Sequence, residues 1–183
     1  TQEEVEWTDM YEYVKKYSLP DYGFTPDGQF PICNKEKGYA DIVFNFDEKC
    51  TSSTGSFEIL SFQSGNATNS IPSTAKATLK GNFENLQNIA EDYIKVNKDE
   101  KISLKLDGNT IVVTAQGVAC HSAYPQQGVN PIIMLGKFLN TLDLKLNAGA
   151  NLVKFIAEFC YDYFGKGLDL YSESEYLNGE YMH

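Results

Sequence analysis

Apolar and polar residues alternate along several short stretches in the middle of the chain, the spacing typical of strands that bury one face. Strands are predicted at residues 39–46, 56–62, 75–80, 102–106 and 110–117. The last two flank Asp107-Gly108-Asn109, which favours a hairpin turn because glycine and asparagine tolerate positive φ angles. The alternating pattern therefore predicts an antiparallel sheet.

Other stretches place their apolar residues at the spacing of one helical face. Helices are predicted at residues 7–17, 83–96, 131–142 and 151–164. Thr8 and Asn82 are predicted to cap the first two, since a side-chain oxygen can accept from a free backbone N–H in the first turn. Pro131 suits the first turn of the third. Strands with intervening helices predict an α+β fold, in which helices cover one face of an antiparallel sheet.

The first part of the chain differs from the rest in its composition and in its pattern of hydrophobic residues. It begins with acidic residues and ends in a stretch rich in proline and glycine, residues 18–28, that cannot continue a helix. The alternating pattern of the strands begins only after this stretch. A domain boundary is therefore expected between residues 1–34 and residues 35–183.

Composition narrows the class of protein. The chain has 183 residues, of which 42% are hydrophobic, so it can bury a core. Its net charge is −10 and all 15 basic residues are lysines, which excludes nucleic acid as a partner, since such binding depends on clustered positive charge. No apolar run reaches the roughly 18 residues that cross a bilayer, so no membrane contact is expected. The four cysteines lack the close spacing of a zinc finger and are expected to be reduced thiols of a cytoplasmic protein.

Few residues could carry chemistry, and each alone has an ordinary interpretation. His121 taken singly is a loop histidine bonded to the backbone, and the adjacent Cys120 would point away from it in an extended segment. Glu3 and Glu4 suit a solvated surface, and Asp27 suits a turn. A metal hydrolase nevertheless needs such parts, because one carboxylate binds the cation and a neighbouring one takes a proton from water.

Four strings that contain these residues occur in a fixed order. They are QEE at residues 2–4, PDYGFTPDGQFP at 20–31, NSIP at 69–72 and HSAYPQQGVNP at 121–131. The series closely resembles the carnosinase-like Xaa-His dipeptidases of the PepV type, within the zinc aminoacylase and glutamate carboxypeptidase family. The resemblance covers nearly the whole chain, and the F-x-P-D-x-x-F-P part of the second string is its most specific piece.

The resemblance implies an enzyme that hydrolyses dipeptides with metal-activated water and two zinc ions, for which manganese or cobalt can substitute. Glu3 corresponds to the general base, Glu4 to a ligand of one zinc ion and Asp27 to a ligand of the other. His121 corresponds to a residue of the lid, the domain that closes over the site, where it stabilises the oxyanion. Asn69 corresponds to a second lid residue that contacts the substrate.

The departures from the family pattern are informative. A His-x-Asp segment and a bridging Asp before Glu3, a distal histidine and the arginine that grips the substrate carboxylate have no counterpart. The chain is therefore expected to be a fragment, with a catalytic-domain remnant at residues 1–34 and the first part of a ferredoxin-like lid at 35–183. Alone it is expected to be inactive and to bind no zinc tightly.

A different class of function stays open. An α+β domain of this kind can serve as a non-catalytic module that dimerises or binds a small metabolite, with its acids merely solubilising. Self-association is also expected through the lid sheet or through exposed helix faces. A His-x-Asp string upstream of Thr1 would favour the peptidase, and its absence would favour the binding module.

Overall fold

The computed structural model describes residues 7–24, 41–47, 52–171, 173–174 and 179–180. Contacts divide the chain into two units, Thr1–Gly38 and Tyr39–His183. In the first unit, helix α1 (Thr8–Lys16) buries none of its residues. The prediction that Thr8 caps this helix is wrong, because Trp7 occupies the cap position and makes no side-chain cap bond. Thr8 already lies within the first turn of the helix.

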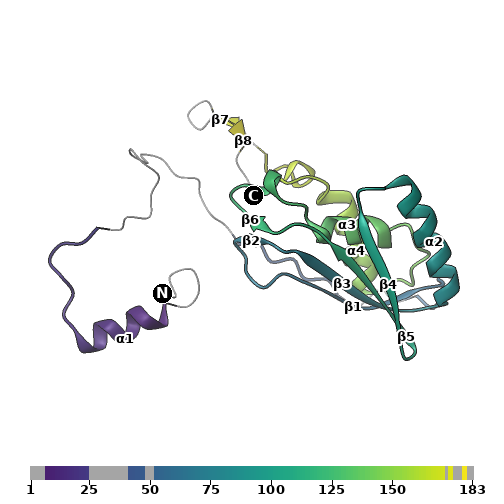
Figure 1. The fold of residues 1–183 in the computed structure, drawn as a ribbon, viewed down its shortest axis with the longest axis horizontal. Helices are drawn as coiled ribbons and strands as arrows, with labels where there is room; N and C mark the ends of the chain where they lie inside the picture. Colours follow the sequence, from purple (N-terminus) through teal and green to yellow (C-terminus); the bar gives the residue numbers. More distant parts are fainter. Residues whose placement is uncertain (1–6, 25–40, 48–51, 172, 175–178, 181–183) are drawn as a thin grey trace. The chain divides into compact units, whose positions relative to one another are not determined.

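The second unit is built on a four-stranded antiparallel sheet (Figure 1). Its strands are β1 (Glu58–Ser64), β3 (Thr74–Lys80), β4 (Lys101–Asp107) and β5 (Thr110–Gln116). Their order across the sheet is β1-β3-β5-β4. Gly108 has a φ of 57° in the turn between β4 and β5, as the hairpin prediction requires. Four of the five predicted strands are thus confirmed, with small shifts at their ends.

The predicted strand at 39–46 is wrong over the described residues 41–47, which pair with no strand. This segment is extended, and it packs two of its rings against helix α4 (Ala148–Phe159) instead. The ring centroid of Phe155 lies 4.7 Å from that of Phe44 and 5.5 Å from that of Phe46. Alternate residues of any extended segment share a face, so the alternation reflects this packing and not a ladder of backbone hydrogen bonds.

Three helices follow the predicted pattern in this unit. They are α2 (Phe83–Val96), α3 (Pro131–Leu139) and α4 (Ala148–Phe159). Each has an asparagine side chain that accepts from a backbone N–H of its first turn, namely Asn82, Asn130 and Asn147. Helix α4 begins and ends earlier than the predicted 151–164, because Asn147 caps its start and Asp162 accepts the N–H of Phe164 in a turn beyond its end. No helix of the described residues is long and apolar enough to cross a bilayer.

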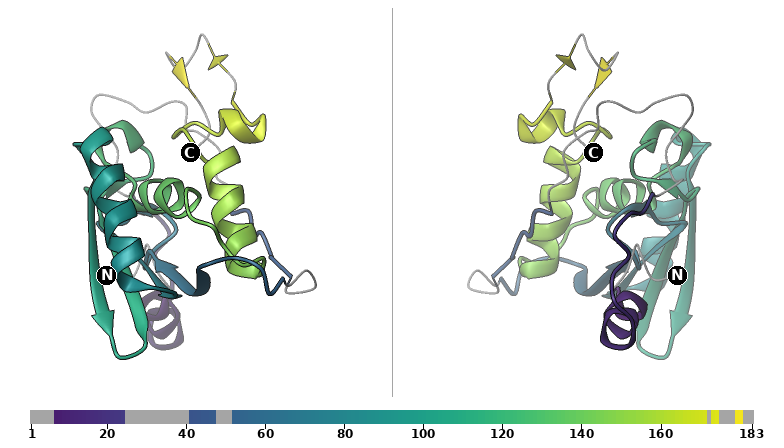
Figure 2. Two further views of the ribbon diagram at one scale, coloured as in Figure 1. Left: turned by 90° about the vertical axis from the view of Figure 1, so that its right-hand side faces the viewer. Right: turned by 90° about the vertical axis from the view of Figure 1, so that its left-hand side faces the viewer.

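The three helices cover one face of the sheet (Figure 2). Helix α2 contacts β4, α3 contacts β3 and β5, and α4 contacts β1. One core joins the layers, and its fully buried residues include Leu79, Val113, Leu86, Phe138 and Val153. On the opposite face of the sheet, β3 presents polar residues, which are Lys76, Thr78 and Lys80. The α+β fold, with helices on one face of an antiparallel sheet, is confirmed.

Tyr93 connects the end of α2 to the start of β4. Its ring packs edge-on against Phe138 with centroids 5.1 Å apart, and its hydroxyl donates to Glu100 Oε2 at 2.9 Å. Partial burial raises the pKa of the Tyr93 phenol, and the hydrogen bond to Glu100 and the negative charge of that carboxylate raise it further. The folded state therefore favours the protonated phenol.

Replacing Tyr93 with phenylalanine should lower the free energy of unfolding by about 1 kcal/mol, the usual value of one such hydrogen bond. In the wild type this contribution is fully present below the ordinary phenol pKa of 10.0. It is lost as the pH rises above that value, because the unfolded chain then releases the phenol proton before the folded chain does. Denaturant unfolding between neutral and alkaline pH measures both effects. Tyr161→Phe, at an exposed tyrosine, is the control. If the free energy of unfolding of Tyr93→Phe fell at alkaline pH as much as that of the wild type, Tyr93 would not be the source of this pH dependence.

Candidate functional site

Two short strands form a ribbon that carries the predicted lid residues. Strand β2 (Ser70–Ile71) pairs antiparallel with β6 (Cys120–His121), so that Ser70 lies opposite His121. The ribbon lies at the end of the sheet where β3 begins and β5 ends, away from the β4–β5 turn (Figure 1). Residues from two distant parts of the sequence therefore meet at one end of the sheet.

Asn69 immediately precedes β2 and is half-buried. Its backbone carbonyl accepts a hydrogen bond from the N–H of Ser122 at 2.9 Å. This bond continues the ribbon by one further pair, so Asn69 lies beside the turn that follows His121. The two residues that the resemblance assigns to substrate contact are thus brought together.

The side chain of His121 is exposed. Its Nδ1 atom accepts a hydrogen bond from the backbone N–H of Ala123 at 3.1 Å. A neutral imidazole that accepts at Nδ1 carries its proton on Nε2. This hydrogen bond favours the tautomer that carries its proton on Nε2, in an imidazole that is exposed to solvent. The ordinary interpretation of this histidine, a residue hydrogen-bonded to the backbone, is confirmed, although His121 lies in β6 and not in a loop.

The segment that contains β6 and the loop after it is closed at its base. Val118 and Val129 exchange two backbone hydrogen bonds, both of 3.0 Å, and the N–H of Gly117 donates to the carbonyl of Ser73 at 2.9 Å. Within the loop, Pro125 is buried in a short 3-10 helix, Pro125–Gln127. These contacts fix the position of the ribbon on the sheet.

Two glycines allow this closure, a role that the sequence pattern did not reveal. A Cβ atom at Gly117 would overlap the backbone carbonyl oxygen of Val129 and lie 2.8 Å from the ring of Pro131. At Gly128 it would lie 2.7 Å from the carbonyl oxygen of Val118. Only a residue without a side chain permits such an approach. Both positions therefore belong to the framework of the site.

Cys120 is half-buried beneath the loop and its thiol is free. Its Sγ lies 3.5 Å from the carbonyl oxygen of Tyr124, whereas the imidazole of His121 bonds to Ala123. The two side chains thus make separate contacts, which agrees with the prediction that Cys120 is no thiol nucleophile activated by His121.

The other predicted site residues, Glu3, Glu4 and Asp27, lie outside the described residues. Their roles as general base and zinc ligands stay predictions. Among the described residues, no group of three or more histidine, cysteine, aspartate or glutamate side chains is placed to hold a metal ion. The described part of the site therefore consists of the ribbon with Asn69 and His121.

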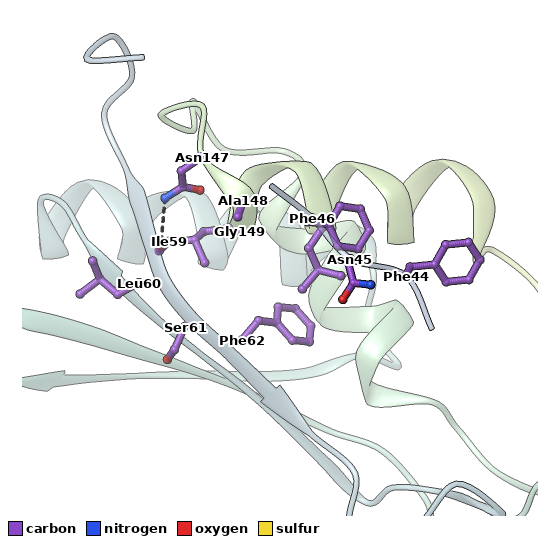
Figure 3. Close-up of a pocket in the computed structure, with 11 residues that line it drawn as sticks. Phe44, Asn45, Phe46, Ile59, Leu60, Ser61, Phe62, Asn147, Ala148 and Gly149 are labelled. Carbon is purple, nitrogen blue, oxygen red and sulfur yellow. Dashed lines mark hydrogen bonds between the residues drawn. The ribbon is translucent and has the colours of Figure 1, made fainter. Parts of the chain in front are cut away.

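An open groove of about 340 Å³ lies elsewhere, between β1 and the start of α4 (Figure 3). Phe44, Ile59 and Phe62 line it with apolar surface, and Asn147 closes one end by donating from Nδ2 to the carbonyl of Ile59 at 2.8 Å. Neither Asn69 nor His121, the two predicted site residues that the structure describes, lines this groove. The ribbon and the groove are separate features.

Comparison with known proteins matches this chain to peptidases. Residues 109–167, which include β6 and the loop of His121, match the family described as the peptidase dimerisation domain. The chain is 31% identical over 98% of its length to "Putative dipeptidase YtjP" of Bacillus subtilis (strain 168), covering 39% of that protein. It is 28% identical over 97% of its length to "Beta-Ala-Xaa dipeptidase" of Lactobacillus delbrueckii subsp. lactis, covering 37% of it. The chain thus spans about two fifths of the length of these curated relatives.

The chain is thus an α+β domain that is similar in sequence to part of known dipeptidases. Residues 109–167 are similar to the dimerisation domain of M20 peptidases, and the similarity to dipeptidases extends over nearly all of the chain. The resemblance seen in the ordered motifs is confirmed at this level.

Proposed function

We propose that this chain is part of a zinc-dependent dipeptidase and that its second unit is the lid of that enzyme. In this proposal residues 1–34 are a remnant of the catalytic domain, and residues 35–183 are the first part of the lid. The observation that carries the proposal is the β2–β6 ribbon, which presents His121 outward beside Asn69. The names of the relatives, which are dipeptidases, support the same class of substrate.

His121 would act on the charge that develops during hydrolysis. The Ala123 N–H occupies its Nδ1, so Nε2 can donate a hydrogen bond to the carbonyl oxygen of the scissile bond. That oxygen becomes negatively charged only as the tetrahedral transition state forms. A donor that is already held in place does not have to reorganise at that moment. Such donors lower the free-energy barrier of the reaction by several kcal/mol. Asn69, at the neighbouring position of the ribbon, would contact the bound dipeptide.

The acidic residues would supply the remaining chemistry. Glu4 and Asp27 carry carboxylates, which suit divalent cations, and each would hold one of two zinc ions together with ligands outside residues 1–183. When bound, zinc polarises the scissile carbonyl and lowers the pKa of water. Glu3 would accept the proton of the attacking water. Manganese or cobalt can occupy sites built from similar ligands.

A second role is self-association. The match of residues 109–167 to a dimerisation domain favours it, and β4 forms an edge of the four-stranded sheet in the part of the chain that is described. An edge strand can pair with another chain. We place the protein in the cytoplasm, where free thiols such as those of Cys120 and Cys160 stay reduced.

The proposal is tested with two protein samples. The protein expressed over its full reading frame should hydrolyse dipeptides, lose this activity on chelation and regain it with zinc. Residues 1–183 alone should hydrolyse none and bind zinc no tighter than roughly micromolar in calorimetric titration, since two ligands belonging to different ions hold neither tightly. A stoichiometric nanomolar zinc site in the isolated chain, or a full-length protein inactive on every dipeptide, would overturn it.

A further inference from the structure

Tyr124 is the large side chain nearest in sequence to His121 in the loop that follows the ribbon. The N–H of Tyr124 donates to the carbonyl of His121 at 3.0 Å, so the two residues are the first and last of one β-turn. The Cα atoms of such residues lie within about 7 Å of each other. The residues between them, Ser122 and Ala123, are small and half-buried. The turn therefore keeps the backbones of His121 and Tyr124 close together.

The backbone of Tyr124 is held firmly. Its carbonyl accepts from the N–H of Gln127 at 3.0 Å, and the thiol of Cys120 lies 3.5 Å from the same oxygen. The next residue, Pro125, is buried. A ring on so well anchored a backbone loses little further freedom when it contacts a ligand.

The side chain of Tyr124 is exposed to solvent. Its exposed fraction is 47%, and its hydroxyl makes no hydrogen bond to a described residue. Two other tyrosines differ, since Tyr93 donates to Glu100 and Tyr163 lies at 3.5 Å from the carbonyl of Gly128. An exposed ring on an anchored backbone, in the same turn as a predicted oxyanion donor, suits a recognition residue.

We infer that Tyr124 is a specificity-determining residue, whose ring packs against the side chain of a bound dipeptide and favours dipeptides that carry a phenyl or phenol group beside the scissile bond. This inference rests on the proposed function, because the ligand is the dipeptide whose carbonyl meets His121. An aromatic pair of this kind changes relative rates by about three- to tenfold.

The test compares kcat/KM of the full-length protein for Ala-Phe, Phe-Ala and Ala-Ala. The wild type should prefer at least one ring-bearing dipeptide by about three- to tenfold over Ala-Ala. Tyr124→Ala should bring the ratio of kcat/KM for the ring-bearing dipeptide to that for Ala-Ala close to one, whereas Tyr124→Phe should keep the wild-type ratio. Tyr161→Ala, at a tyrosine with an exposed fraction of 51% outside the loop, is the matched control and should keep the preference.

The outcomes separate this inference from the proposed function. If the wild type cleaves dipeptides but Tyr124→Ala retains the preference, or slows all three substrates equally, the inference is wrong and the proposed function stands. If the wild type cleaves none of the dipeptides, the proposed function fails and the inference fails with it. Circular dichroism and the melting temperature of Tyr124→Ala confirm that the variant is folded.

Discussion

Replacing His121 with alanine should lower kcat for dipeptide hydrolysis by about a hundredfold to a thousandfold, the usual effect of removing one oxyanion donor. KM should change little, because the hydrogen bond from Nε2 strengthens only as charge forms on the carbonyl oxygen. Steady-state kinetics of the full-length protein measure both constants. A glutamine at this position keeps an amide donor and should recover part of the lost turnover.

The control for this variant is Gln126→Ala, which removes another exposed side chain from the same loop. It should behave like the wild type. An unchanged kcat in His121→Ala would remove His121 from the mechanism. An increase in KM alone would make it a binding residue that does not act on the transition state.

Replacing Gly117 with alanine should lower kcat/KM by about a hundredfold, although this residue contacts no substrate in the proposal. The new Cβ would overlap the carbonyl oxygen of Val129, which belongs to the bridge that closes the His121 loop. Backbone must move to relieve that contact, and a displacement of about 1 Å at a catalytic group can cost this much. The melting temperature should fall at the same time.

Gly108→Asn is the matched control for the Gly117 variant. Gly108 has a φ of 57° and open space around it, and asparagine tolerates this conformation. The substitution lies in the β4–β5 turn, at the far end of the sheet from the ribbon, and should leave activity unchanged. If Gly117→Ala retains full activity, the closed loop does not position His121.

The elements with strong local signals could be predicted from the sequence. Helix α2 has the predicted bounds, 83–96, because Asn82 caps it and its apolar face follows the helical period. The β4–β5 hairpin follows likewise from its turn residues. Residues 41–47 show the limit of such reasoning, since alternation alone does not reveal whether an extended segment pairs with a strand or packs on a helix.

The candidate site depends on contacts that no local pattern contains. Asn69 and His121 were identified through motifs, but their proximity comes from the pairing of Ser70 with His121 in strands of two residues each. Strands so short have no period to detect. The closure at Gly117 likewise becomes apparent only when Val129 is placed against it.

The most direct test of the central claim is the affinity of a phosphinic dipeptide analogue, whose tetrahedral phosphorus carries the negative oxygen that the transition state develops. If Nε2 of His121 donates to that oxygen, His121→Ala should weaken inhibition of the full-length enzyme by about a hundredfold to a thousandfold, matching its loss of kcat. Equal inhibition of wild type and variant would contradict the claim that the ribbon holds His121 as an oxyanion donor.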